Sequence, residues 1–291
     1  MDIIKRRLIH FTHCRGAGWK TIYSFIQHDP TLDGIYKYNP TDLIHHFRMK
    51  ENHANAFYFD VHHLNIDKII KELSLHQITP ITPFDTLYPP LLLNTYDPPW
   101  VLYCKGDMNL LKSAQTLAVV GTRFPSQLGL KSIDKLLPPI INDGWTIVSG
   151  LAEGIDTKAH ELTMKLKGKT IGVLGSGLLH IYPRKNLPLA QCMSKEQLLV
   201  SEYPPHQKPQ RWQFPERNRI ISGLSQGILV VEAKEKSGAL ITADQGLEQG
   251  REVFAVPGSI LEERSTGTNS LIQNGAKLVL NSSDILTELS C

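Results

Sequence analysis

Short apolar runs recur from Leu117 to the end of the chain, and stretches with helical character separate them. Continuous Val, Ile and Leu runs are typical of strands buried on both faces, as in a parallel sheet. Helices between such strands form right-handed crossovers, so the pattern predicts an α/β fold with a doubly wound, mostly parallel sheet. The expected strands are Leu117–Val120, Thr146–Val148, Thr170–Leu174, Leu198–Val200, Gly227–Val231, Val253–Val256 and Lys277–Leu280.

The first part of the chain has a different composition. Nine of the twelve histidines fall within residues 1–76, where short helical patterns replace the apolar runs. This shift predicts a small all-helical domain over 1–75 and an α/β domain over 76–291. Residues 77–110 are rich in proline and are expected to be a structured, irregular connector. We expect the histidines of the first part to be surface residues and to form no metal site.

A glycine-rich turn stands near the start of the chain. Gly16-Ala-Gly18, followed by Lys20-Thr21 and an apolar stretch, is similar to the turn of a helix-hairpin-helix. In that motif the glycines allow backbone N–H groups to approach a phosphate. A tight turn between two helices, without a ligand, fits the same residues and is the reading that we favour slightly.

Cysteine use and hydropathy indicate the compartment. Cys14, Cys104, Cys192 and Cys291 lie far apart without paired spacing, which argues against a zinc site or a disulfide framework and fits a reducing cytoplasm. No apolar run is long enough to span a bilayer, and the N-terminus lacks the features of a signal peptide.

Positive charge is concentrated in one stretch, although the net charge is only +3. Residues 175–225 hold seven Lys or Arg residues against three acidic residues, and Tyr182, Tyr203, Trp212 and Phe214 are interleaved with them. Single-stranded nucleic acid needs charges for its backbone and rings for its bases, which this mixture supplies. A solvated basic face is the alternative reading.

Within that stretch, two arginines flank an asparagine. Arg217 and Arg219 stand on either side of Asn218, at an expected helix entrance just before the strand Gly227–Val231. Guanidinium groups beside free helix N–H groups favour an anion such as phosphate, and Phe214 could stack on a base. An arginine cluster that joins two layers of the fold would give the same pattern.

Small or polar residues follow most of the expected strands. Because each following helix offers N–H donors, glycines at so many strand ends predict an anion-binding edge in preference to simple turns. The candidate binding residues at these ends are Thr122, Arg123, Ser149, Gly150, Gly175, Gly177 and Ser237.

Catalytic and nucleotide motifs are weak or absent. The chain has no P-loop, and Gly175-x-Gly177-x-x-His180 lacks the third glycine of a dinucleotide fingerprint. Asp156 and His160 are more simply a helix-start acid and a satisfied histidine than an acid–base pair. We expect Glu153, Glu202 and Glu232 to cap helices or to pair with Arg217 and Arg219. The pattern therefore favours binding over turnover, with no catalytic residue, metal or cofactor.

Taken in order, these motifs closely resemble the DprA family of DNA-processing proteins, also called Smf. The resemblance covers roughly residues 80–280, and so many motifs in one order are highly specific. It rests on Gly121–Arg123, Ser149–His160, Val173–Gly177, Tyr182–Asn186, Ser201–Pro204, Phe214–Arg219, Val231–Ala233, Ser237–Thr242, Phe254–Gly258 and Gly267–Ala276.

The resemblance implies an extended Rossmann-like domain that binds single-stranded DNA. It implies protection of incoming DNA during natural transformation, and loading of the recombinase RecA onto strands covered by single-strand-binding protein. The N-terminal domain would be sterile-alpha-motif-like or helix-hairpin-helix-like. Many members also carry a C-terminal winged-helix-like module, for which residues up to 291 leave no room.

The family's binding motifs map onto this chain residue by residue. They place DNA contacts at Arg123, Arg184, Lys185, Asn186 and the segment Phe214–Arg219. Thr122 replaces the family's Ser and keeps the hydroxyl, whereas His180 stands where many members have Asp. The family also dimerises through the end of this domain, which points to Leu271, Ile272, Leu278 and Val279, unless these four are ordinary core residues.

Two other classes of function remain open from the residues. A nucleotide-processing enzyme related to phosphoribohydrolases would share the fold, but its Pro-Gly-Gly-x-Gly-Thr-x-x-Glu motif is missing, and Glu232–Ala243 is the nearest stretch. A nucleotide-sensing or protein-interaction scaffold would need no DNA contact.

Overall fold

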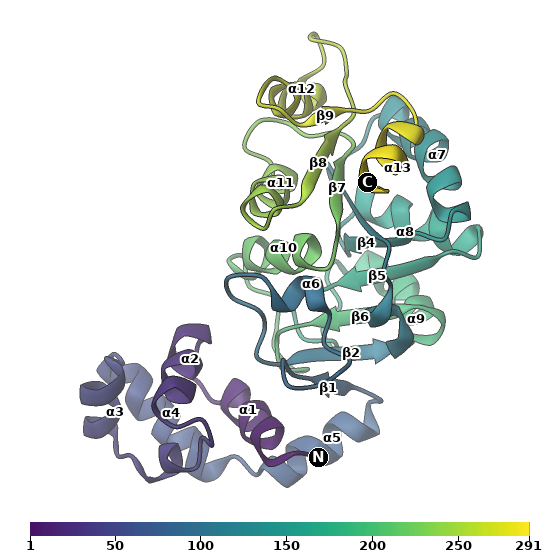
Figure 1. Cartoon of the computed structure of the whole chain (residues 1–291). Helices are drawn as coiled ribbons and strands as arrows, with labels where there is room; N and C mark the ends of the chain where they lie inside the picture. Colours follow the sequence, from purple (N-terminus) through teal and green to yellow (C-terminus); the bar gives the residue numbers. More distant parts are fainter. Residues whose placement is uncertain (291) are drawn as a thin grey trace.

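A nine-stranded sheet forms the centre of the computed structural model, which describes residues 1–290 (Figure 1). The strand order is β1-β2-β6-β5-β4-β3-β7-β8-β9. The seven strands predicted from apolar runs are all confirmed and are parallel to their neighbours among them. They are β3 (Thr116–Val120), β4 (Thr146–Gly150), β5 (Lys169–Val173), β6 (Leu198–Ser201), β7 (Gly227–Val230), β8 (Glu252–Ala255) and β9 (Lys277–Leu278).

The order of these strands creates a switch point. From β3 the chain adds β4, β5 and β6 on one side, and it then crosses back to add β7, β8 and β9 on the other. The loops that follow β3 and β7 therefore leave in opposite directions at the carboxyl edge of the sheet. Ligands of doubly wound folds bind in this crevice.

Helices cover both faces of the sheet (Figure 1). Apolar residues of α10, α11 and α12 pack on one face, and those of α7, α8 and α13 pack on the other. The helices of this domain are α6 (Pro90–Leu93), α7 (Gln127–Asn142), α8 (Ile155–Lys165), α9 (Leu187–Glu196), α10 (Gln213–Gly223), α11 (Gly238–Glu248), α12 (Thr266–Gln273) and α13 (Ser283–Leu289).

The proline-rich segment 77–110 is more regular than its sequence suggests. It supplies β1 (Thr79–Ile81) and β2 (Leu102–Gly106), and β2 pairs antiparallel with both β1 and β6. The expectation of an irregular connector was therefore wrong for these residues. The prolines hid the strands because they interrupt the apolar pattern between them, and the partner of β2 lies almost one hundred residues further along the chain.

Five helices form the N-terminal part: α1 (Ile3–His13), α2 (Trp19–His28), α3 (Pro40–Phe47), α4 (Glu51–His63) and α5 (Ile66–Leu75). Phe11, Phe25 and Phe57 meet in its core. This core continues without a break into Tyr103 of β2 and into residues beyond β4 and β5. The helices thus pack directly against the β1–β2 end of the sheet (Figure 1).

The glycine turn joins α1 to α2 by close packing. Gly16 has φ +80°, and a Cβ at this position would lie 2.4 Å from the His53 carbonyl oxygen of α4. Helix packing therefore explains Gly16 without a ligand.

Histidines and cysteines have mixed environments. His10 is buried, bonded to Tyr36 and to the Leu64 carbonyl oxygen, so the expectation of surface histidines was wrong for it. Cys14 and Cys104 are buried, Cys192 is exposed, and Cys291 lies outside the described residues. Within residues 1–290, no group of His, Cys, Asp and Glu side chains could hold a metal ion. In the same part of the chain, no helix has the length and apolar character needed to cross a membrane.

Candidate nucleic-acid interface

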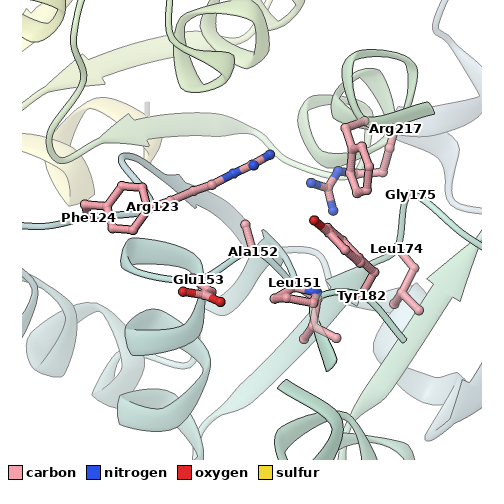
Figure 2. A pocket seen from close by; sticks show the side chains of 11 residues that line it. Arg123, Phe124, Leu151, Ala152, Glu153, Leu174, Gly175, Tyr182 and Arg217 are labelled. Carbon is pink, nitrogen blue, oxygen red and sulfur yellow. The ribbon is translucent and has the colours of Figure 1, made fainter. Parts of the chain in front are cut away.

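A cavity of about 210 Å³ lies at the carboxyl ends of β3, β4 and β5. It opens into a wider groove of about 710 Å³, which runs along the loops after β3 and β7 at the switch point. The two share Arg123, Phe124, Ala152, Tyr182, Phe214 and Arg217. Figure 2 shows the cavity with two guanidinium groups and a tyrosine hydroxyl turned toward its centre.

Arg217 forms the base of this cavity. It extends from α10, donates from Nη1 to the Val173 carbonyl oxygen at the end of β5, and donates from Nε to Asn218 Oδ1 at 3.2 Å. The residue is only 6% exposed, and burial lowers its pKa. Among the described residues, no carboxylate lies within 4.0 Å of its guanidinium group. Arg217 is therefore a desolvated cation whose charge is not matched by a direct ion pair.

Two residues of β4 and α8 surround this cation. A Cβ at Gly150 would lie 2.5 Å from Asp156 Oδ2 and 2.6 Å from Arg217 Nη1, so only glycine leaves room for both side chains. Burial raises the pKa of Asp156 to about 6, although Arg217 opposes this shift. Gly150 thus leaves space for the side chains of Asp156 and Arg217, and its expected role as a backbone phosphate donor lacks support.

Arg123 supplies a second positive charge from the loop after β3. Its side chain is exposed and reaches toward Arg217 across the cavity (Figure 2). No hydrogen bond or ion pair holds its guanidinium group in the described part of the chain. Thr122 positions this loop, because its N–H donates to the Glu232 carbonyl oxygen and its Oγ1 accepts from the N–H of Phe124.

Aromatic rings stand beside the charges. Tyr182 and Phe214 meet with ring centroids 5.5 Å apart, and Tyr182 is about half exposed. Gly175 lies beneath Phe214, since a Cβ there would be 2.8 Å from the ring. Phe124 is 73% exposed at the rim, and Trp212 is exposed with its ring edge-on to Tyr203. Flat surfaces and cations therefore border the same cavity.

The loop after β5 divides into exposed and anchoring residues. Arg184 and Lys185 are exposed and follow Pro183, which lines the cavity, and Lys185 Nζ lies 3.8 Å from Oε2 of Glu153, another lining residue. Asn186 is buried, and its amide donates to the carbonyl oxygens of Leu151 and Ala152. Asn186 therefore ties this loop to the loop after β4, and the structure does not place it as a direct DNA contact.

Arg219 does not reach the cavity. Helix α10 begins at Gln213, one turn earlier than the sequence suggested, so Arg217 and Arg219 lie within the helix and their side chains diverge. The Arg219 guanidinium group is buried, pairs with Glu202, and contacts Asp97 Oδ2 at 3.2 Å. The expected role of Arg219 in phosphate binding is corrected by this placement, whereas the expected pairing of Glu202 with an arginine is confirmed.

Two other candidates, Ser149 and Gly177, line neither the cavity nor the groove, whereas Asn218 is buried but contributes to the groove wall. Ser149 is fully buried and donates to the Val119 carbonyl oxygen, and Gly177 packs against the carbonyl oxygens of Pro204 and Pro205. Asn218 is buried and donates to the Gly238 carbonyl oxygen, which fixes α10 to α11. Ser149 and Gly177 therefore support the lining residues and do not line the interface themselves.

Ser237 also lines the groove. Its buried hydroxyl has no hydrogen-bond partner among residues 1–290, and it stands at the start of α11. It thus remains a candidate contact.

The carboxylates and histidine near the cavity are engaged. His160 is buried between Thr170 Oγ1 and the Gly150 carbonyl oxygen, each 2.7 Å from a ring nitrogen, and burial lowers its pKa to about 4. It is a satisfied core histidine, as the sequence suggested. Glu232 binds the N–H and hydroxyl of Ser126 at the start of α7, so its capping role is confirmed.

Sequence reasoning missed several lining residues. Phe124, Leu151, Ala152 and Leu174 line the cavity, and Lys234 and Lys236 line the groove. Leu151 and Leu174 directly follow strands, and the other four lie within six residues of the end of a strand. The position at the carboxyl edge was therefore a usable signal, but apolar residues there looked like core.

The chain matches known proteins over most of its length. The sequence model of the family of DNA recombination-mediator protein A matches residues 79–290. The DNA processing protein DprA of Bacillus subtilis (strain 168) is 55% identical over 202 residues, which make up 69% of this chain and 68% of that protein.

Two solved structures are also similar. The X-ray structure of DNA processing protein A from Streptococcus pneumoniae is 37% identical, covers 99% of both chains and has a TM-score of 0.85. A structure of DNA processing protein A from Helicobacter pylori, described for its single-stranded DNA binding mode, is 29% identical. It covers 74% of this chain and 96% of its own, with a TM-score of 0.67.

The raised pKa of Asp156 predicts a pH effect on stability. Because its pKa of about 6 exceeds the ordinary value of 3.8, the folded protein holds this proton more tightly than the unfolded chain. This contribution to the free energy of unfolding is present at low pH and is lost as the pH rises through about 6.

The side chain of the Asp156→Asn variant cannot ionise. The free energy of unfolding of this variant should therefore increase relative to that of wild type as the pH rises from 3.8 to about 6, and the difference should stay constant at higher pH. Urea unfolding of both proteins at several pH values measures the difference. A difference that does not change with pH would contradict the expected titration.

Proposed function

The chain belongs to the family of DNA recombination-mediator protein A, and from that premise we propose that it binds single-stranded DNA in the cavity and groove at the switch point. One observation carries this proposal. Arg123 and Arg217 face a common cavity without a carboxylate partner among the described residues, and aromatic rings line the same cavity. A phosphate would supply the direct ion pair that both guanidinium groups lack.

In this proposal, charged residues bind the phosphates and aromatic residues bind the bases. Arg217 and Arg123 bind phosphate oxygens inside the cavity, and Arg184 and Lys185 attract the backbone at its rim. Tyr182, Phe214 and Phe124 offer faces on which unpaired bases stack. Phosphate contacts and stacking carry little base identity, so binding is largely independent of sequence. A duplex binds less well because its bases are already paired and stacked.

Family membership supports a proposal for what happens to the bound strand. We propose that the protein protects incoming single strands in the cytoplasm during natural transformation and delivers them to the recombinase RecA. A strand held by its phosphates and a few bases stays accessible along the rest of its length, which suits transfer to a recombinase. Single-strand-binding protein is the expected competitor for the same DNA.

We also propose a homodimer formed through the β9 end of the sheet. Leu278 of β9 is 44% exposed, and Ile272 of α12 is half-buried beside this edge. Leu271 packs against the domain core and Val279 is buried in it, so these two support the surface from within. Edge strands offer unpaired backbone groups, and two such edges can pair.

Loss of the exposed cavity arginine, Arg123, should weaken the binding of single-stranded DNA. We expect Arg123→Ala to bind oligo-dT about tenfold to hundredfold more weakly, since a charge-assisted contact is lost. The slope of log affinity against log salt should fall by about one. Fluorescence anisotropy at several salt concentrations measures both quantities.

Lys169→Ala is the matched control. This residue is exposed at the amino end of β5, on the opposite edge of the sheet. It should bind as wild type does. If Arg123→Ala and the control bind equally well, the cavity is not the DNA site.

Delivery to RecA can be measured separately from DNA binding. We expect the protein to increase DNA-dependent ATP hydrolysis by RecA on a single strand covered by single-strand-binding protein. Arg123→Ala should lose this effect because it no longer holds the strand. If wild-type protein binds DNA but leaves RecA activity unchanged, the loading function is refuted while the binding site stands.

A charge at the sheet edge should separate the dimer. Leu278→Glu is expected to be a folded monomer by light scattering after gel filtration, because the carboxylate would be buried in the interface. Leu75→Glu, at the exposed end of α5, is the control and should stay dimeric. A folded Leu278→Glu protein that remains a dimer would place the interface elsewhere.

A further inference from the structure

Four aromatic residues form a stacked group where the helical part meets the sheet. Trp19 of α2 lies 5.2 Å from Tyr23, 5.6 Å from Trp100 and 6.2 Å from Tyr96 between ring centroids. The interplanar angles are 11°, 21° and 28°, so all three pairs are stacked. We call this group the aromatic ladder.

The aromatic ladder is held rigidly but is not covered. Trp19 Nε1 donates to the Pro98 carbonyl oxygen at 2.8 Å, and Trp100 Nε1 donates to the Trp19 carbonyl oxygen at 3.1 Å. The polar atoms of both indoles are thus satisfied, yet Tyr96 is 85% exposed and Tyr23 is 45% exposed. Stacked rings that are ordered in advance and open to solvent can accept a further flat ring at low entropic cost.

The aromatic ladder lies on the same edge of the sheet as the cavity. Strand β2 runs antiparallel to β6, and Tyr103 near its start pairs with Ser201 at the end of β6. Trp100, just before β2, therefore lies at the carboxyl edge. Strand β2 is the second strand from β5 in the sheet, which corresponds to roughly 10 Å between these two strands at the usual spacing. Trp100 also packs against the apolar cluster that includes Leu151 and Leu174 of the cavity wall.

A basic loop runs between the helical part and the groove. In the segment 202–212, His206 contacts Glu72 of α5, and Arg211 lines the groove. Lys208 and Arg211 are exposed on this loop, and Lys20 is exposed next to Trp19. The exposed side chains of Lys208, Arg211 and Lys20 thus supply positive charge near the groove and next to Trp19, as a phosphate backbone requires.

We infer that the aromatic ladder is a second binding site for the same single strand, on which unpaired bases stack after the strand leaves the cavity. This inference rests on the proposed function. Tyr96 and Tyr23 supply the outer faces for bases, and Trp19 and Trp100 hold them in place. Lys20 and the loop 202–212 contact the intervening phosphates.

A purely structural role for the aromatic ladder is the competing explanation. The two tryptophans do join the helical part to the sheet through their hydrogen bonds. The exposed tyrosines, however, lie on the outside of this junction, so a structural role makes them dispensable for binding DNA of any length.

The test compares short and long oligonucleotides. The double variant Tyr23→Ala/Tyr96→Ala truncates only exposed rings, and Tyr58→Ala, an exposed tyrosine of α4 outside the aromatic ladder, is the control. Oligo-dT of about 5 nucleotides should fill only the cavity, whereas oligo-dT of about 20 nucleotides should reach both sites. We expect the double variant to bind the short oligonucleotide as wild type does, and the long one at least about fivefold more weakly.

The outcomes separate the inference from the function. Equal affinity of the double variant and wild type for both lengths would overturn the second site and leave the cavity intact. Failure of wild type to bind either length would overturn the proposed function, and the second site with it. Ultraviolet cross-linking of a long 5-bromodeoxyuridine oligonucleotide to wild type gives an independent readout. Cross-links at Trp19, Trp100 or Tyr96 support the site, and cross-links confined to cavity residues refute it.

Discussion

A buried guanidinium group without a direct counter-charge is the constraint around which the interface is built. Removing an ion from water costs on the order of several kcal/mol, and a partner usually offsets that cost. Arg217 obtains only backbone and amide acceptors, from Val173 and Asn218. The nearby Asp156 compensates the charge of Arg217 only in part. Burial raises the pKa of Asp156 to about 6, so this carboxyl group is less readily ionised than an exposed one. Arg217 therefore lies at the base of the cavity without a direct ion pair, and the proposed binding of a phosphate depends on this arrangement.

The surrounding residues maintain this arrangement instead of contacting a ligand. Gly150 leaves the space that Arg217 and Asp156 occupy, and Asn186 joins the loops after β4 and β5. The pair of Arg219 with Glu202 fixes the other side of the same helix. Two arginines two residues apart on α10 thus have opposite roles, because successive helical positions point in different directions.

These roles explain which parts of the site the sequence predicts. Each parallel strand is visible because its Val, Ile and Leu runs record burial on both faces, which is a local property. The role of Arg219 depends on Glu202 and Asp97, which lie on other elements, and no local pattern reports such a pairing. Glycines after strands predicted an edge adapted to close approach. At Gly150, Gly175 and Gly177, however, the close neighbour is a side chain or a carbonyl of the protein itself. Strand β2 escaped prediction for the same reason as Arg219, since its partner β6 is remote in sequence.

The continuity between the helical part and the sheet places the N-terminal helices where the inferred second site requires them. Their core merges with that of the carboxyl edge through Tyr103, so α2 is held at a set position relative to the cavity. Two weak contacts on one rigid edge, joined by the strand itself, reinforce each other because the first binding event raises the local concentration of bases at the second. With both proposed sites, such an edge would distinguish a long flexible strand from mononucleotides and from short fragments without reading any base. A mediator that must hold single strands of arbitrary sequence needs that kind of selectivity.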